Sequence, residues 1–468
     1  MEVISERKSQ IMLMLAVGLV VTMDGLDGSI VNVALPSIAS SFMIDTGTSS
    51  WVTVTYLMMI AGLLLVFSKL ADRGLVKKIL IVGLMMFLVF SLMCGLSTSY
   101  SMLLIGRIFQ GIGAAMMAAC APLLCVRYLP VSMLGLGMSI VTLGASLGFA
   151  LGPALGGVIT EYLSWQWIFF INIPIGIAGI ILVIYAIPKD SGYTKTYFDL
   201  SGAILMFIVI ASGVFALERF SHAGLGDVQI IISLPICMVA FVLFIVWESR
   251  CKMPILNLKI FRMWRFDAVF IAFLSINIVY MGLLYLLPFY LNLEMGLDYA
   301  RIGMYLFVPP VVTLLICIQV GRWSDLAGRR WFCVLACAAL AILSFIYAFI
   351  DPKMGFAPLA VALVLMGLVW GLGGGPAASR IVETAGEKEK GTGSALMAVS
   401  GYLGGVLGTT FFSAFFLIVT DSGNTPFSEM SQSVFITGFH ATMIMGAVLA
   451  IVAIMLSMIV NDDKKKVR

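Results

Sequence analysis

Long apolar runs of about 20 residues or more follow one another along almost the whole sequence. A helix that crosses the hydrocarbon core of a bilayer needs roughly 20 predominantly apolar residues. Such runs lie at about 11–34, 51–70, 78–97, 101–126, 132–160, 165–187, 199–220, 228–248, 266–293, 300–323, 331–350, 357–380, 392–420 and 434–460. The pattern predicts an all-α integral membrane protein with 14 transmembrane helices. The first run is too long for a signal-peptide core, so we expect it to be retained as a span.

The composition excludes the common soluble classes. Only 11% of the 468 residues are charged and 61% are hydrophobic, whereas a soluble domain carries roughly 25% charged residues. This excludes a soluble enzyme, a nucleic-acid-binding protein and an extracellular disulfide scaffold. The eight cysteines are scattered, and only Cys333 and Cys337 lie one helical turn apart. The two histidines are distant from that pair, so we expect no metal site. No P-loop is found, and we expect no nucleotide cofactor.

The positions of Lys and Arg predict the orientation of the helices. Segments on the cytoplasmic side of a membrane carry an excess of these residues. If both termini are cytoplasmic, the inner segments hold 24 of the 28 basic residues. The outer segments then hold only Arg219, Arg301 and Lys353, and Arg107 lies within a span. We therefore predict that both termini are cytoplasmic.

A short fragment occurs twice, about 250 residues apart, each time between two spans. The first copy runs from Ser68 to Arg73, and the second from Gly321 to Arg330. The repeat predicts two six-helix bundles, at 1–190 and at 263–468 with its basic tail, and an inserted helix pair at 191–262. An Asp at a helix end can accept backbone N–H bonds and pair with a neighbouring Arg. We expect a cytoplasmic gate formed by Asp72, Arg73, Asp325, Arg329 and Arg330.

An ordered series of motifs resembles a known family. The motifs are Leu26-Asp27 with Ile30–Pro36, Trp51–Leu57, Arg107–Gly113, Gly148–Gly157, Trp165–Pro174 and Leu287–Leu291. In this series the chain resembles a major facilitator superfamily transporter, and within that superfamily the fourteen-span drug:proton antiporter family. It departs from the family pattern at Ser68 and Leu75, where glycine is usual, and Asp24 is not part of the pattern.

Charged residues inside the bilayer are the sharpest functional signal. A mid-membrane Asp or Arg costs about 2.5–3.5 kcal/mol on insertion scales, so each one needs a reason. Asp24 and Asp27 lie three residues apart on the first span, about 60° around the helix, so both can face one cavity. We predict proton coupling by Asp27, Asp24 and Arg107, the role that the resemblance implies for the fourth-helix Arg. The alternative is a structural role. The carboxylates would then accept hydrogen bonds from Ser, Asn or backbone groups at a helix break, and Arg107 would form a buried ion pair with one of them.

Small and aromatic residues suggest the interfaces and the pocket. Glycines four residues apart on the fifth span allow another helix to approach closely, and a proline permits a kink. The family's antiporter motif corresponds here to Gly148, Gly152, Pro153, Gly156 and Gly157. Packing alone also explains such a stripe.

Aromatic faces attract organic cations. The substrate-binding candidates are Asp27, Tyr56, Gln110, Asn277, Tyr280, Tyr285 and Trp370.

The resemblance implies a proton-coupled antiporter that exports amphipathic, cationic drugs or toxic compounds by alternating access. Protonation and cation binding would compete for one negative charge. We expect a monomer in the cell inner (plasma) membrane, whose partners are small amphipathic substrates and the lipid bilayer, with protons as coupling ions and no cofactor. An alternative is a proton-coupled transporter of an endogenous lipid, metabolite or siderophore. A membrane-embedded enzyme or receptor would need a catalytic constellation or a signalling domain, and neither is visible in the sequence.

Overall fold

The computed structural model describes residues 4, 6–130, 133–188, 190, 199–223, 227–251, 254–351, 354–386, 390–422 and 425–461, and within them every regular element is a helix. The first elements are α1 (Arg7–Phe42), α2 (Thr46–Leu70), η1 (Ala71–Leu75), α3 (Val76–Gly95), α4 (Tyr100–Tyr128), α5 (Leu134–Tyr162), α6 (Trp167–Phe170), α7 (Asn172–Ala186), α8 (Leu200–Ala223) and α9 (Val228–Arg250). The others are η3 (Leu258–Arg262), α10 (Trp264–Leu293), α11 (Tyr299–Ala327), α12 (Arg330–Phe349), α13 (Ala357–Thr384), α14 (Lys390–Thr420), η5 (Phe427–Glu429) and α15 (Gln432–Ile459).

Thirteen helices in the described part of the chain are long and apolar enough to cross a membrane. This agrees with the expected class, because only a helix satisfies all its backbone polar groups within one span. One of the thirteen, Thr46–Gly95, has 50 residues, roughly twice the length that one crossing needs. It contains the second and third expected spans, separated at Gly74, where φ is 100°. Fourteen separate crossings and cytoplasmic termini stay predictions.

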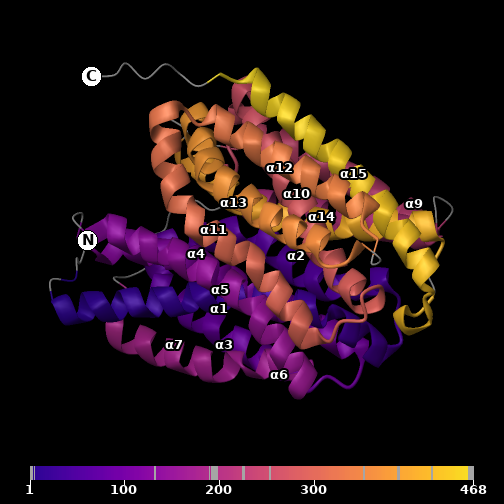
Figure 1. The fold of residues 1–468 in the computed structure, drawn as a ribbon. Helices are drawn as coiled ribbons and strands as arrows, with labels where there is room; N and C mark the ends of the chain where they lie inside the picture. The colour runs from indigo at the N-terminus through magenta and orange to yellow at the C-terminus, as the bar shows by residue number, and fades with distance from the viewer. Residues whose placement is uncertain are drawn as a thin grey trace.

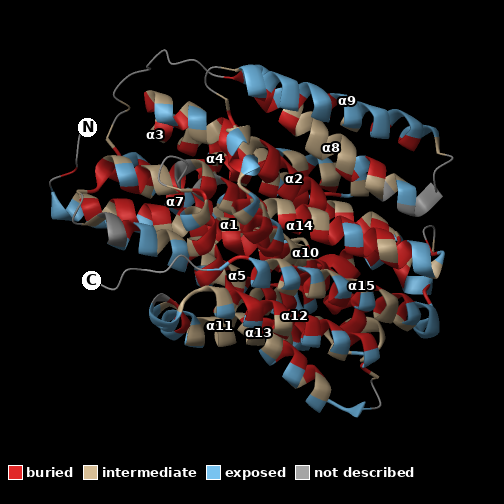
Figure 2. Ribbon diagram, turned by 90° about the horizontal axis from the view of Figure 1, so that it is seen from above, coloured by how far each residue is buried: buried red, intermediate tan, exposed pale blue. Residues whose placement is uncertain are grey.

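Two groups of helices pack side by side (Figure 1). In the first group α1 packs on α5, and α3 packs on α4; in the second α12 packs on α15, and α10 packs on α14. The groups meet where α5 contacts α11 and where α2 contacts α14. The helices α8 and α9 pack on each other, and only α8 adds extensive contacts to α2 and α14. Figure 2 shows α9 at the edge of the molecule with most of its surface exposed. We call the two groups the N-terminal bundle (α1–α7) and the C-terminal bundle (α10–α15).

The bundles are joined directly at one end of the helices. The Tyr285 hydroxyl of α10 donates a hydrogen bond to the carbonyl oxygen of Thr46 in α2. The backbone N–H of Phe427 donates to the carbonyl oxygen of Ile44 over 3.0 Å, and that of Tyr299 donates to the Glu161 carboxylate over 3.0 Å. The predicted topology places this joined end outside the cell. The helices of the two bundles diverge toward the opposite end (Figure 1).

The glycine stripe of α5 brings this helix against two others. A Cβ atom built on Gly156 would lie 2.7 Å from the carbonyl oxygen of Ile30, and Gly148 and Gly152 meet the same helix, α1. On another face, a Cβ atom built on Gly157 would lie 2.8 Å from the Cα atom of Gly303 in α11. The stripe therefore packs α5 mainly within its own bundle, while Gly157 contributes to the contact between bundles at the joined end.

We expect Gly148→Ala to destabilise the protein. A Cβ atom there would lie 2.7 Å from the backbone nitrogen of Leu26, and backbone cannot move aside cheaply. Overpacking of this kind costs roughly 1–3 kcal/mol. Gly375→Ala is the matched control, because nothing lies within 4 Å of a Cβ atom there. Thermal unfolding in detergent should show a lower midpoint for Gly148→Ala and an unchanged or higher one for the control. Equal shifts for both variants would contradict the packing argument.

Candidate functional site

A cavity of about 310 Å³ lies between the two bundles. This volume is at the lower end of the range for small-molecule sites. The N-terminal bundle contributes Asp24, Asn32 and Tyr56, and Asp24 is the one charged side chain among the described residues that line the cavity. From the C-terminal bundle the polar and aromatic lining residues are Asn277, Tyr280, Thr313, Trp370, Tyr402 and Thr409. The site thus combines one carboxylate with aromatic faces and neutral hydrogen-bonding groups.

The Asp24 carboxylate is held by one tyrosine from each bundle. The Tyr56 hydroxyl of α2 donates a hydrogen bond to Oδ1 over 3.0 Å, and the Tyr402 hydroxyl of α14 donates to Oδ2 over 2.8 Å. Hydrogen bonds to an ionised group are roughly twice as strong as neutral ones. Asp24 therefore does two things at once: it offers a negative charge to the cavity, and it ties the bundles together near the middle of the spans.

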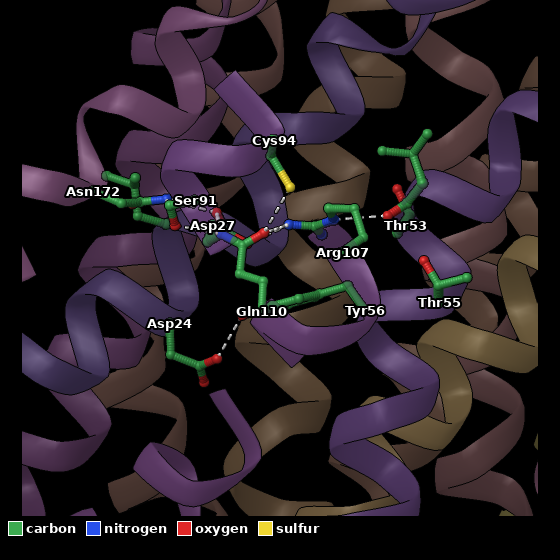
Figure 3. Close-up of polar contacts among 12 residues, drawn as sticks. Asp24, Asp27, Thr53, Thr55, Tyr56, Ser91, Cys94, Arg107, Gln110 and Asn172 are labelled. Carbon is green, nitrogen blue, oxygen red and sulfur yellow. Dashed lines mark hydrogen bonds and ion pairs between the residues drawn. The ribbon is translucent and has the colours of Figure 1, made fainter. Parts of the chain in front are cut away.

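Asp27, one turn further along α1, has a different environment. Its side chain is fully buried and forms an ion pair with Arg107 of α4, with 2.6 Å between Nη1 and Oδ2. Its Oδ1 atom accepts hydrogen bonds from the amides of Gln110, over 3.0 Å, and Asn172, over 2.8 Å. Figure 3 shows these side chains converging on the carboxylate. The pair is therefore enclosed within the N-terminal bundle, behind the cavity wall.

Arg107 is almost completely buried, and protein groups bind its guanidinium. Its Nε atom donates to the carbonyl oxygen of Val52 over 2.8 Å, and Nη1 also donates to the Gln110 side chain over 2.8 Å. Its guanidinium lies 4.0 Å from the centre of the Tyr56 ring, within the range of a cation–π contact. Tyr56 consequently touches both systems: its ring covers Arg107 while its hydroxyl binds Asp24.

The substrate-binding candidates from the sequence fall into two sets. Tyr56, Asn277, Tyr280 and Trp370 line the cavity, as do Gly401 and Gly405 beside Tyr402. Asp27, Gln110 and Tyr285 do not line it. Asp27 and Gln110 belong to the buried network, and Tyr285 lies at the joined end. We expected both carboxylates of α1 to face one cavity; only Asp24 does so, because Asp27 points toward Arg107.

Tyr402 is the main site residue that sequence reasoning missed. Composition gave no way to choose one tyrosine among 14. One signal was present, since Tyr402 stands among the small residues Gly401, Gly404 and Gly405 of the thirteenth predicted span. An aromatic residue flanked by small residues that allow close approach can contact a neighbouring helix.

The second copy of the repeated fragment contacts helices of its own bundle. Arg329 forms an ion pair with Glu383 at the end of α13. Arg330 donates a hydrogen bond to the side chain of Asn461, just after α15. Asp325 belongs to α11, but its side chain lies outside the described residues. The contacts that are described therefore hold α12, α13 and α15 together at the end opposite the joined end.

The first copy lies at the same end of the N-terminal bundle. Asp72 and Arg73 belong to η1, and Asp72 is exposed and interacts electrostatically with Lys69 and Arg127. The start of α3 is capped by Asp190, whose carboxylate accepts the backbone N–H of Lys77 over 3.0 Å. Whether these residues form a gate stays a prediction. Among the described residues no group of three or more His, Cys, Asp or Glu side chains could hold a metal ion.

Comparison with known proteins places the chain among transporters. The sequence model of the Major Facilitator Superfamily matches residues 17–409. The riboflavin transporter RibZ of Clostridioides difficile (strain 630) is 28% identical over 412 residues, which cover 88% of this chain and 89% of that protein. The putative multidrug resistance protein MdtD of Escherichia coli O81 (strain ED1a) is 31% identical over 351 residues, 74% of each chain.

Solved structures show the same fold at low sequence identity. A bacterial homologue of the human lysosomal transporter Spinster, in an inward-facing and unoccupied conformation, matches with a TM-score of 0.71 at 15% identity, over 97% of both chains. The nucleoside transporter NupG matches with a TM-score of 0.65 at 10% identity, over 96% of this chain and 99% of that one. Both likenesses concern the fold alone.

Proposed function

Because the chain belongs to the Major Facilitator Superfamily, we propose that it is a proton-coupled antiporter of the inner membrane that exports amphipathic, cationic aromatic compounds by alternating access. Membership of the family and the transporter relatives indicate a multi-pass membrane transporter rather than an enzyme. The match to putative multidrug resistance proteins is consistent with the drug:proton antiporter family. The proposal adds the coupling ion, the class of substrate and the residues that carry each.

The observation that supports the proposal most directly is the position of Asp24. It is a carboxylate in a cavity between the bundles, and Tyr280 and Trp370 line the same cavity. Their rings stand edge to face, with centroids 5.7 Å apart. A flat cation would place its charge near Asp24 and its rings against these aromatic faces. To bind Asp24 fully, it would replace the Tyr402 hydroxyl on Oδ2. Substrate binding would thereby break the hydrogen bond between Tyr402 and Asp24 that connects the two bundles.

We assign proton coupling to the enclosed pair of Asp27 and Arg107. A proton that reaches Asp27 would convert the carboxylate into a neutral carboxyl group and remove the partner of the Arg107 charge. The guanidinium would then keep only neutral partners, among them Gln110 and the Tyr56 ring. Tyr56 contacts both Arg107 and Asp24, so the uncompensated positive charge of Arg107 would lie close to Asp24. It would repel a cation bound there and weaken its binding. Proton uptake and cation release would follow from one shift of charge.

Transport into vesicles tests this function. The protein is reconstituted into proteoliposomes, a pH gradient is imposed, and the uptake of a fluorescent lipophilic aromatic cation is followed. We expect accumulation that depends on the gradient and collapses when a protonophore is added. Accumulation that is equal with and without the gradient would refute proton coupling.

A second candidate is a neutral heteroaromatic metabolite as substrate. Two observations favour it: similarity to a riboflavin transporter over most of the chain, and amide and hydroxyl groups of Asn32, Asn277 and Thr409 in the cavity. Such groups can bind a polar ring edge without any charge. Equilibrium binding of riboflavin and of a lipophilic cation to the purified protein separates the two. Binding of riboflavin alone would favour the second candidate.

We expect Tyr402→Phe to tighten the binding of a cationic substrate. The variant keeps the ring but frees Asp24 Oδ2 from a donor that the substrate would otherwise displace. A hydrogen bond to a charged group contributes about 1.5–3 kcal/mol, so the affinity should rise roughly tenfold or more. Fluorescence titration of the purified protein measures the change. Tyr185→Phe is the control, because that side chain is 76% exposed. Weaker binding by Tyr402→Phe would show instead that its hydroxyl binds the substrate directly.

A further inference from the structure

A second pair of buried carboxylates lies in the inserted helices α8 and α9, which contribute none of the described residues that line the cavity between the bundles. Asp199 immediately precedes α8, and Glu248 lies in the last turn of α9. Their side chains are only 2% and 3% exposed. A Cβ atom built on Gly202 would lie 2.5 Å from Asp199 Oδ2 and 2.6 Å from Glu248 Oε1, so these two oxygens lie within about 5 Å of each other. Glycine at position 202 leaves room for both carboxylates.

The two carboxylates have unequal surroundings. Asp199 caps the start of α8: its Oδ1 atom accepts the backbone N–H of Gly202 over 2.9 Å and the indole N–H of Trp247 over 2.6 Å. Helix N-termini stabilise negative charge, and these two donors add to that effect. Glu248 lies at the C-terminal end of α9, where the helix dipole disfavours an anion. Asp199 therefore has two hydrogen-bond donors and a helix N-terminus beside its carboxylate, whereas Glu248 has the C-terminal end of a helix beside its own.

Glu248 has only weak partners that would stabilise a charge. Neither of its carboxylate oxygens, nor Asp199 Oδ2, has a hydrogen-bond partner in the described part of the chain. The backbone N–H groups of Ile255 and Leu256 approach Glu248, but without the geometry of a normal hydrogen bond. Lys69 of α2 interacts with Glu248 electrostatically, but it is exposed, so solvent screens its charge. A buried charge without compensation is far more costly than a buried neutral carboxyl group.

We propose that Glu248 binds a proton beside Asp199, forming a second proton-binding site in the inserted helix pair. A metal ion fits the site poorly, because Ca²⁺ or Mg²⁺ takes at least six oxygen ligands and only three unpaired carboxylate oxygens are described here. One proton leaves the pair with a single negative charge. Loss of that proton would put a second negative charge at the end of α9, next to Ile255 and Leu256 in the segment that leads into α10. The site is therefore a pH-sensitive junction between α9 and the C-terminal bundle.

Infrared difference spectroscopy of the purified full-length protein tests the assignment. The spectrum of the parent minus that of Glu248→Gln should contain a protonated-carboxyl band at neutral pH that disappears at alkaline pH. Asp227→Asn is the control: it alters a partly exposed carboxylate that caps the other end of α9, and it should leave the band in place. Absence of the band would overturn the proposal. Loss of the band on adding Na⁺ or Mg²⁺, but not choline, would show a metal-cation site instead.

A second variant tests the role of the neighbouring charge. Asp199→Asn keeps a capping residue but removes the like charge, so the Glu248 band should disappear at lower pH than in the parent. An unchanged titration would contradict the pairing. Stability provides another readout. The folded parent binds one more proton here than the unfolded chain, so its stability should fall as the pH rises, and Glu248→Gln should lose this dependence. These tests measure protonation, not transport, and do not depend on the proposed function.

Discussion

Asp27→Asn is expected to abolish most transport driven by a pH gradient, with a loss of at least about tenfold, which corresponds to about 1.4 kcal/mol. Asn has nearly the shape of Asp, so the amides of Gln110 and Asn172 stay close to their positions, but the side chain can no longer take up and release a proton. It also imitates the protonated state permanently. The variant should therefore bind substrate weakly and respond little to an imposed gradient in proteoliposomes.

A control and a second variant keep this result interpretable. Asp421→Asn makes the same chemical change at an exposed residue, and its left-handed backbone, with φ of 49°, suits Asn. It should transport like the parent. Removing one partner of a buried pair destabilises a protein by roughly 3–5 kcal/mol, so folding must be checked by the unfolding midpoint. A folded Asp27→Asn protein that accumulates the cation as well as the parent would disprove the coupling role of Asp27.

Asp24→Asn is expected to remove the preference for cations. The amide keeps a hydrogen-bond acceptor for one tyrosine, but the cavity loses the one carboxylate among its described lining residues. A charged hydrogen bond contributes about 1.5–3 kcal/mol, so affinity for a lipophilic cation should fall by roughly 10- to 100-fold. Affinity for a neutral ligand of the same shape should change much less. Equilibrium binding of both ligands to the purified variant measures the difference.

The comparison of the two ligands distinguishes charge recognition from general damage. If both ligands lose affinity equally, Asp24 serves mainly to hold Tyr56 and Tyr402 in place. Ser146→Ala is a suitable control, because its hydroxyl lines the same cavity but donates to the carbonyl oxygen of Thr142 in its own helix. It should bind both ligands like the parent. Unchanged cation binding by Asp24→Asn would contradict our assignment of the substrate site.

Hydropathy predicted most of the fold because the bilayer limits a chain so strongly. Every long apolar run expected from the sequence corresponds to helix in the structure, and the family match agrees with the motifs of the spans. Local breaks were harder to see. The predicted span at 165–187 contains the short helix α6 followed by α7. The kink at Gly74 lies between two expected spans that form one uninterrupted helical stretch, Thr46–Gly95. Such breaks depend on single residues and contacts, which an average over 20 residues conceals.

The candidate site was only partly predictable. Charge in an apolar span singled out Asp24, Asp27 and Arg107, and the structure places all three close together around Tyr56. The periodicity of a helix could not assign them to different environments, because residues 60° apart can face the same neighbour or different ones. The division depends on where α2, α4 and α14 lie relative to α1. For the same reason Tyr402, which is 378 positions from Asp24, could not be paired with it in advance.

The bond between Tyr402 and Asp24 has a consequence for the protein when no substrate is present. A proton-coupled exporter that changed conformation without bound substrate would let protons flow back into the cell without moving any substrate. In this molecule the Tyr402 hydroxyl binds the Asp24 carboxylate and links the two bundles. A ligand must outcompete that internal occupant, which lowers its apparent affinity. If the protein is the proton-coupled exporter that we propose, this bond would suppress conformational changes without substrate, and the proton gradient would drive transport mainly when substrate is bound.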